Sequence, residues 1–567
     1  MFAVVSAATS AFAAAAGQPA TELDGYWDAT VSSRPSASAD ASFQGVRRSD
    51  PAEHPLAAAG PGRPGSAPNP DNPSHSISLR AVDRAGNPAD DGQTSYAIYS
   101  LETGGQVAFG QIGADSAVQL PAGRFGMRSS VLTPGSDTAP ASRTLVIHPE
   151  LDLTADTTVT LDARAGKPVS VDLDQPTATQ VSALVTVLQT ATNGRLIRYE
   201  FGDTSFTDGT YFVTPTPARS DLNTYVYTVW TMPDRPEIYN LVNATTGRVP
   251  EQLIYRVRVA TLAAVQVRYP AQGVDACGGT YIGPLYQGVP ATVSYGTRFP
   301  LPTRRTEYYI PSTDVSWFTE FDQMAKDCTF DEIDVQTAPP VTYRRPGKHQ
   351  AIWNSAPFAP STTDASGQPA ATRDGDSIRI RLPMFADSQP GHGDYAGPYA
   401  GATGAVVLSS GDAKVCGSDL EAATCDAPSG LHEYQLAASA TRKVSWSTLS
   451  TQTATNWTFR SATTPSTQAL PLISAKYDMR LDDYNNAPAN QPYSFAVVTG
   501  TRMTTATLDV SIDGGVTWRP VPLDRTHNGW QATLVNPASG GVSLRFAATD
   551  AAGNHVRQTI TNAYQVS

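Results

Sequence analysis

Residues 506–512 read ATLDVSI, and residues 377–382 read SIRIRL. In both stretches apolar and polar side chains alternate with a period of two, which is typical of a β-strand that buries one face. Similar short stretches recur from Ser76 onward, separated by turns rich in Gly, Pro, Asn and Asp. The sequence therefore predicts an all-β protein.

The composition agrees with this fold class and excludes some partners. The chain has 567 residues, only 16% of them charged, with 44 Gly and 44 Pro, so turns are favoured over long solvated helices. This length is too great for a single core and indicates several domains. The formal net charge of -12 leaves no basic surplus for phosphates, so we expect no nucleic-acid partner. No run reaches the ~20 apolar residues of a membrane span.

The first 75 residues differ from the rest of the chain. Residues 1–16 are apolar, rich in Ala and contain A-x-A patterns, although no Lys or Arg precedes them. They predict a signal-peptide-like segment and hence a secreted, extracellular protein. Residues 17–75 are dominated by Pro, Ala, Gly and Ser and cannot bury enough apolar area to offset their ordering entropy, so we expect a disordered linker.

Four β domains are expected after the linker, as serial β-sandwiches of carboxypeptidase-regulatory-like and Ig/fibronectin-like type. One helical turn is also predicted, because Trp317, Phe321 and Met324 follow a spacing of i, i+4, i+7. The expected domains are a β-sandwich at 76–175, a β-sandwich at 176–270, a β-rich domain with the four cysteines at 271–469, and an Ig-like β-sandwich at 470–567.

The four cysteines are Cys277, Cys328, Cys416 and Cys425. None has the C-x-x-C spacing of zinc or thiol redox sites, so disulfides are the better interpretation in a secreted chain. Four cysteines allow three pairings. Cys416 and Cys425 are close enough in sequence to clip a hairpin, which would leave the other two to close a longer loop.

Residues 511–518 read SIDGGVTW and match the Asp-box hairpin pattern S-x-D-x-G-x-T-W. In this pattern the carboxylate accepts hydrogen bonds from turn amides, the glycines take the turn dihedrals and the Trp covers the hairpin base. We expect a structural role for the residues that form it, which are Ser511, Asp513, Gly514, Gly515 and Trp518.

No established catalytic or metal motif is found. The patterns G-x-S-x-G, H-x-H and H-E-x-x-H are absent. His392 lies in the sequence GHGD, which resembles only the first two residues of the His-Gly-Thr-His motif of subtilisins. We therefore predict no catalytic, cofactor-binding or metal residues and no cofactor. The remaining enzymatic option is a carboxylate pair within the densest acidic run, which contains Glu320, Asp322, Asp327, Asp331, Glu332 and Asp334.

Several stretches resemble a known family when taken in order. Residues 450–461 (STQTATNWTFRS), 470–473, 511–518 and 548–554 resemble the long C-terminal region of large secreted subtilisin-like serine proteases of actinobacteria. Residues 79–88 (LRAVDRAGNP) and 120–125 (LPAGRF) resemble the β-sandwich that follows the catalytic domain there. The resemblance spans about 76–567 and implies β-sandwich accessory domains. Residues 1–75 cannot contain the protease domain, so no catalytic residue carries over.

These observations predict a secreted, non-catalytic multidomain β protein that acts as an accessory binding or spacer module. The ligand would be a protein or a polysaccharide, the latter bound by an aromatic ring such as Trp353 or Trp530. Two alternatives remain open: a fragment of a secreted serine protease whose catalytic domain is encoded upstream, and an extracellular hydrolase that uses a carboxylate pair.

Overall fold

The computed structural model describes residues 44–48 and 73–567, apart from 90, 204, 207–209, 287–288, 291–292, 330–333, 365–366, 395–400, 421, 501 and 528. The predicted leader at 1–16 and most of the predicted linker lie outside these residues. The described elements are β-strands and two 3-10 helices, η1 (Ala163–Ala165) and η2 (Val259–Thr261). The all-β prediction is confirmed.

Four sheets make up the N-terminal stack. Sheet I has the order β5 (Ala117–Pro121), β2 (Ser74–Val82), β8 (Thr157–Asp162). Sheet II has the order β15 (Leu253–Val257), β9 (Lys167–Leu173), β12 (Tyr211–Val213), β7 (Ser142–Leu153), β6 (Gly123–Thr133), β3 (Asp91–Ser100), β4 (Gln106–Gly113). Sheet III has the order β11 (Leu196–Asp203), β10 (Thr179–Thr190), β13 (Leu222–Thr231), β14 (Glu237–Thr246), β20 (Thr303–Tyr309), β16 (Ala263–Tyr269), β23 (Gly347–Ile352). Sheet IV has the order β1 (Gln44–Arg48), β19 (Val293–Leu301), β17 (Ala276–Tyr286), β21 (Val315–Met324), β22 (Asp334–Thr337), β26 (Gly393–Asp394), and β18 (Val289–Pro290) pairs with β17.

Three further sheets make up the C-terminal block. Sheet V has the order β28 (Ala413–Ser418), β27 (Ala402–Ser410), β30 (His432–Arg442), β31 (Gln452–Ser461), β41 (His555–Val566), β40 (Gly540–Asp550), β36 (Met503–Ser511), β37 (Arg519–Val521), and β34 (Asn486–Ala487) pairs with β41. Sheet VI has the order β29 (Ala423–Asp426), β25 (Ser377–Ile380), β24 (Ala371–Gly375), β32 (Thr464–Ala469). Sheet VII has the order β33 (Ala475–Asp478), β35 (Pro492–Thr499), β39 (Gly529–Val535), β38 (Leu523–Thr526).

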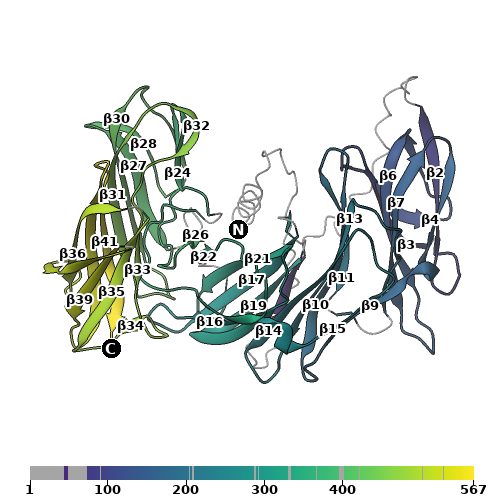
Figure 1. Cartoon of the computed structure of the whole chain (residues 1–567), viewed down its shortest axis with the longest axis horizontal. Coiled ribbons are helices and arrows are strands. Elements are labelled where there is room, and N and C mark those ends of the chain that lie inside the picture. Colours follow the sequence, from purple (N-terminus) through teal and green to yellow (C-terminus); the bar gives the residue numbers. More distant parts are fainter. Residues whose placement is uncertain are drawn as a thin grey trace.

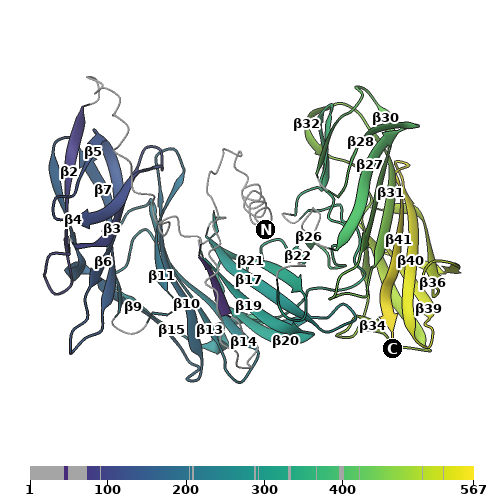
Figure 2. The same ribbon diagram turned by 180° about the vertical axis from the view of Figure 1, so that it is seen from behind.

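The sheets of the N-terminal stack are layered, with a separate core between each pair. Ile77 and Met127 belong to the core between sheets I and II, whereas Val185 belongs to the core between sheets II and III. Tyr227 and Phe321 belong to the core between sheets III and IV. Sheets I and II lie at one end of the molecule, the C-terminal block lies at the other, and sheets III and IV lie between them (Figures 1 and 2). The molecule is therefore elongated.

Sheet III is covered on both faces, which the alternating sequence pattern did not predict. Val181, Ala183 and Val185 alternate with other residues as in a strand with one solvent face, yet β10 is buried continuously from Ser182 to Gln189. A polar side chain in this run has a hydrogen-bond partner in the interior: the Thr186 hydroxyl donates to Glu200 Oε1 at 2.7 Å. Continuous burial follows because sheet II packs on one face and sheet IV on the other.

Strand pairs join segments on both sides of three expected domain boundaries. β9 pairs with β15 across 175/176, β14 pairs with β20 across 270/271, and β31 pairs with β41 across 469/470. The segment 470–567 therefore shares sheet V with strands that precede it, and in this structure it is not a separate sandwich.

One local prediction is wrong. Trp317, Phe321 and Met324 lie in strand β21, not in a helical turn. A spacing of i, i+4 also places two residues on one face of a strand, and Met324 is buried although it lies on the other face, so the spacing did not distinguish the two structures. Within the predicted disordered linker, β1 forms a strand that pairs antiparallel with β19.

Candidate functional site

A cluster of buried and half-buried polar side chains lies where sheet IV meets the C-terminal block. We call it the polar joint. The joint takes residues from strands β21, β22 and β26 of sheet IV, from β30 of sheet V and from β33 of sheet VII. Loops contribute its other residues. Its members are Gln272, Gln323, Asp334, Gln336, Asn354, Asp387, His392, Asp394, Arg442, Lys476 and Asn485.

Two asparagines hold the loops of the joint together. Asn354 Nδ2 donates to the Pro270 carbonyl and to Gln323 Oε1, each at 2.7 Å, and Asn354 Oδ1 accepts from Gln272 Nε2 at 2.7 Å. Asn485 Nδ2 donates to the Asn354 carbonyl at 3.1 Å. Asn354 and Asn485 have φ values of 59° and 60°, a left-handed conformation that Asn tolerates better than most side chains. The joint therefore uses asparagine for both backbone geometry and hydrogen bonding.

Arg442 connects the C-terminal block to this amide network. Its Nη2 donates to Gln272 Oε1 at 2.7 Å and to the Leu449 carbonyl at 2.8 Å. The guanidinium carbon lies 4.6 Å from the ring centroid of Phe385 and 5.3 Å from that of Trp446. Arg442 is only 3% exposed, so its charge is held in the interior by hydrogen bonds and aromatic faces.

Two carboxyl groups meet inside the joint. Gln336 pairs with Asp394 across β22 and β26, and Asp334 lies two residues before Gln336 on the same face. Asp334 and Asp394 are each 1% exposed. Burial raises the pKa of Asp334 above its ordinary value, while Arg442 and the contacts with Asp394 and Gln336 oppose this rise and Asp387 adds to it.

A histidine, an aspartate and a lysine border the carboxyl pair. His392 Nδ1 lies 3.1 Å from Asp387 Oδ1, and the imidazole stacks on Trp353 with 4.3 Å between ring centroids. Lys476 Nζ donates to the Asp387 carbonyl at 2.6 Å. Burial lowers the pKa of Lys476, and the charges of Asp387 and Asp394 oppose this shift.

The acidic run that the sequence singled out does not assemble as one site. Asp327 is exposed and accepts a hydrogen bond from its neighbour Thr329, whereas Asp322 is fully buried. Asp331 and Glu332 lie outside the described residues. Asp334 does enter a carboxyl pair, but its partner Asp394 comes from a segment 60 positions later, which the run did not indicate.

The sequence missed Asp387, Asp394, Arg442 and Lys476. No local pattern distinguishes these residues from surface residues; Arg442, for example, lies between Thr441 and Lys443. Trp353, proposed as an aromatic binding platform, is 5% exposed and belongs to the core. Trp530 is partly buried, with the Arg525 guanidinium carbon 4.8 Å from its ring centroid.

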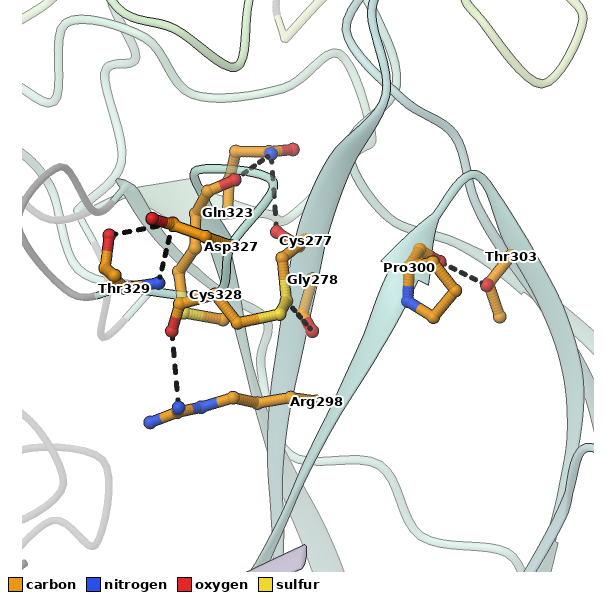
Figure 3. Close-up of a disulfide and its surroundings, with 10 residues drawn as sticks. Cys277, Gly278, Arg298, Pro300, Thr303, Gln323, Asp327, Cys328 and Thr329 are labelled. Atoms are coloured by element: carbon orange, nitrogen blue, oxygen red, sulfur yellow. Dashed lines mark hydrogen bonds between the residues drawn. A yellow bond between two sulfur atoms is a disulfide. The ribbon is translucent and has the colours of Figure 1, made fainter. Parts of the chain in front are cut away.

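The cysteines form two disulfides, Cys277–Cys328 and Cys416–Cys425, and the described residues contain no free cysteine. The first bond ties β17 to the turn that follows β21 (Figure 3). Arg298 Nη1 donates to the Cys328 carbonyl at 3.3 Å and further fixes this turn. The disulfide therefore stiffens the sheet IV side of the joint.

The predicted Asp-box hairpin lies between β36 and β37. Asp513 Oδ1 accepts from the Thr517 amide at 2.9 Å and from the Ser511 hydroxyl at 2.7 Å. Hydrogen bonds from the Thr517 hydroxyl and amide and from Ser511 hold the pKa of Asp513 well below its usual range. Gly514 and Gly515 have φ values of 72° and 94°. Trp518 is partly exposed and stacks with Arg545, with 4.4 Å from the guanidinium carbon to the ring centroid, so it is not a core residue.

Comparisons with known proteins give little. No known family matches the chain, and no curated protein matches it. Among solved structures, a putative adhesin from Bacteroides ovatus has 8% sequence identity and a TM-score of 0.10, covering 46% of this chain and 77% of that chain. The Bacillus anthracis TIE protein has 11% identity and a TM-score of 0.10, covering 67% of this chain and 70% of that chain. Likenesses at this TM-score carry no argument about this protein.

The described residues contain no group of three or more His, Cys, Asp or Glu side chains placed to hold a metal ion. In the same part of the chain, no helix is long and apolar enough to cross a membrane.

Proposed function

We propose that this chain is a secreted, non-catalytic β protein that acts as a rigid binding or spacer module. The observation that carries this proposal is the continuity of its interior. Successive sheets share cores from Ile77 to Val566, and the polar joint bridges sheet IV and the C-terminal block. Such a body holds surfaces at its two ends at a constant separation.

Two disulfides support the secreted assignment, since disulfides persist in oxidising compartments and are rare in the cytosol. The resemblance to accessory regions of secreted subtilisin-like proteases points the same way. A partner protein or a polysaccharide is the ligand class that we propose for a binding role.

The hydrolase alternative is less well supported by the geometry. A catalytic carboxylate pair has to face a substrate across a cleft. Asp334 and Asp394 are each 1% exposed, and Arg442 and Lys476 surround them as in an internal ionic cluster. We therefore assign this pair to the joint and not to a reaction.

A substrate screen tests the proposal. The purified full chain is incubated with panels of peptide and glycoside substrates, in parallel with Asp331→Asn, Glu332→Gln and Asp334→Asn variants. We expect no turnover by any of them. Turnover by the native chain that one of these substitutions abolishes would overturn the non-catalytic assignment.

A further inference from the structure

We propose that Asp334 and Asp394 share one proton in the folded joint, and that release of this proton to solvent loosens the contact between sheet IV and the C-terminal block. The inference goes beyond the proposed function, because it adds a pH-dependent control to the joint.

Placement of the two carboxyl groups is the first argument. Asp334 and Asp394 lie on the same face of two paired strands, two positions apart in register, and both are almost completely excluded from solvent. Two ionised carboxylates offer only acceptors to each other, whereas a carboxyl and a carboxylate form a hydrogen bond. Like charges this close in the interior repel strongly, so the singly protonated pair is the stable form.

The surrounding charges give the second argument. The groups that face the pair are Arg442 from β30, Lys476 from β33, and Asp387 with His392 from the loop before β26. Arg442 and Lys476 supply two basic groups against the three carboxyl groups of Asp334, Asp387 and Asp394. A second ionised carboxylate in the pair would have no counter-charge within the cluster, and burying it would be costly.

The direction of the pH effect follows from the raised pKa of Asp334. Between the ordinary aspartate pKa, near 3.9, and the higher pKa in the folded joint, the folded form binds more protons than the opened form. The stabilisation is therefore complete in acid and is lost as the pH rises through the folded pKa. Within this window the opening constant rises by up to about tenfold per pH unit, and it levels off above the window.

The location of the pair makes the effect specific to the joint. β26 (Gly393–Asp394) lies in the chain between β25 and β27 of the C-terminal block, and it joins sheet IV by pairing with Gln336 and Thr337 of β22. Within the described residues this pairing spans two positions, so side-chain contacts help to hold β26 in place. Loss of the shared proton therefore acts first on the attachment of β26, while the cores inside each block are unaffected.

Amide hydrogen exchange of the full chain between pH 4 and 9 tests the inference, after correction for the intrinsic pH dependence of exchange. We expect peptides with Gln336–Thr337 and Gly393–Asp394 to open more readily as the pH rises, whereas peptides from β20 do not change. Asp334→Asn mimics the protonated side chain, so it should remove the pH dependence. Asp412→Asn makes the same change at an exposed turn and should leave the pH dependence of the joint unchanged.

A pH-independent joint in the native chain, or an unchanged pH dependence in Asp334→Asn, would overturn the inference. If Asp334→Asn does not fold, Asp394→Asn replaces it. There the new amide donates to Asp334 and should move the transition to lower pH, so an unchanged transition contradicts the inference. These outcomes are independent of the substrate screen, which concerns catalysis and not the joint.

Discussion

Two buried ionic clusters lie close to each other in the molecule and are built in different ways. Between sheets III and IV, Glu307 accepts from Arg305 Nη2 at 2.6 Å, from Tyr269 at 2.7 Å and from Tyr309 at 2.7 Å, so one negative charge meets one positive charge and two hydroxyl donors. In the polar joint, three carboxyl groups face Arg442 and Lys476. The first cluster sets one carboxylate against one guanidinium, whereas the second has one carboxyl more than it has basic partners.

The difference separates a cluster that stabilises the fold from a cluster whose stability depends on pH. A matched pair inside a double-covered sheet resists change, and removal of one partner leaves an uncompensated buried charge. In a cluster with one carboxyl in excess, loss of a proton leaves a buried carboxylate without a counter-charge and so weakens the contacts around it. Because the joint lies where sheet IV meets the C-terminal block, this weakening affects the contact between them.

The largest effect is expected from Glu307→Ala. It leaves the guanidinium of Arg305 buried without its counter-charge, and we expect a loss of about 3–5 kcal/mol in the free energy of unfolding. Denaturant titration measures it. Glu251→Ala is the matched control, because its side chain is 76% exposed and its ion pair with Lys167 spans 3.8 Å, so a change within about 0.5 kcal/mol is expected. Equal losses in the two variants would contradict the comparison.

An intermediate effect is expected from Asn354→Ala in the joint. The change removes the hydrogen-bond partner of the Pro270 carbonyl and of the side-chain amides of Gln323 and Gln272. We expect the free energy of unfolding to fall by about 2–3 kcal/mol. Thermal unfolding followed by hydrogen exchange should show this loss at the junction first.

Asn490→Ala is the control for the backbone contribution. Asn490 also has a positive φ, 53°, but it is exposed, so both variants share the conformational cost of alanine in the left-handed region. The excess loss in Asn354→Ala measures the hydrogen bonds of the joint. No excess would mean that the amide network does not hold the blocks together.

The smallest effect is expected from Asp513→Ala in the exposed hairpin. Hydrogen bonds from Thr517 and Ser511 lower the pKa of Asp513, so its contribution is present above the unfolded pKa near 3.9 and is lost as the pH falls toward the folded pKa. The denaturation midpoint of the variant should thus fall slightly at pH 7 and approach that of the native chain in acid. A difference that grows on acidification would contradict this role.

The sequence predicted those features that depend on neighbours along the chain. Period-two alternation in residues 506–512 and 377–382 places strands β36 and β25 correctly, and the turn at 83–87 is closed by Asp83, which accepts from the Asn87 amide at 2.8 Å. The turn at 550–554 repeats this contact, with Asp550 accepting from the Asn554 amide at 2.9 Å. The sequence also predicted that the four cysteines form disulfides, but it left their pairing open.

The features that the sequence did not predict depend on distant segments. Nothing in β10 indicates that sheet IV would cover its second face, because a buried Thr or Ser in a strand looks the same in sequence as an exposed one. The polar joint likewise draws Asp334, Asp394 and Arg442 from segments far apart in the chain. Its members could be recognised only once the strand pairing was known.

The distance between the two ends of the molecule tests the central claim most directly. Spin labels on noncanonical residues at Asp115, in the exposed turn before β5, and at Val516, which is 80% exposed at the Asp-box hairpin, report this distance by pulsed electron paramagnetic resonance. A rigid module predicts a single narrow distance distribution at pH 6. A broad distribution spread over several nanometres would show that the blocks move independently and would contradict the account.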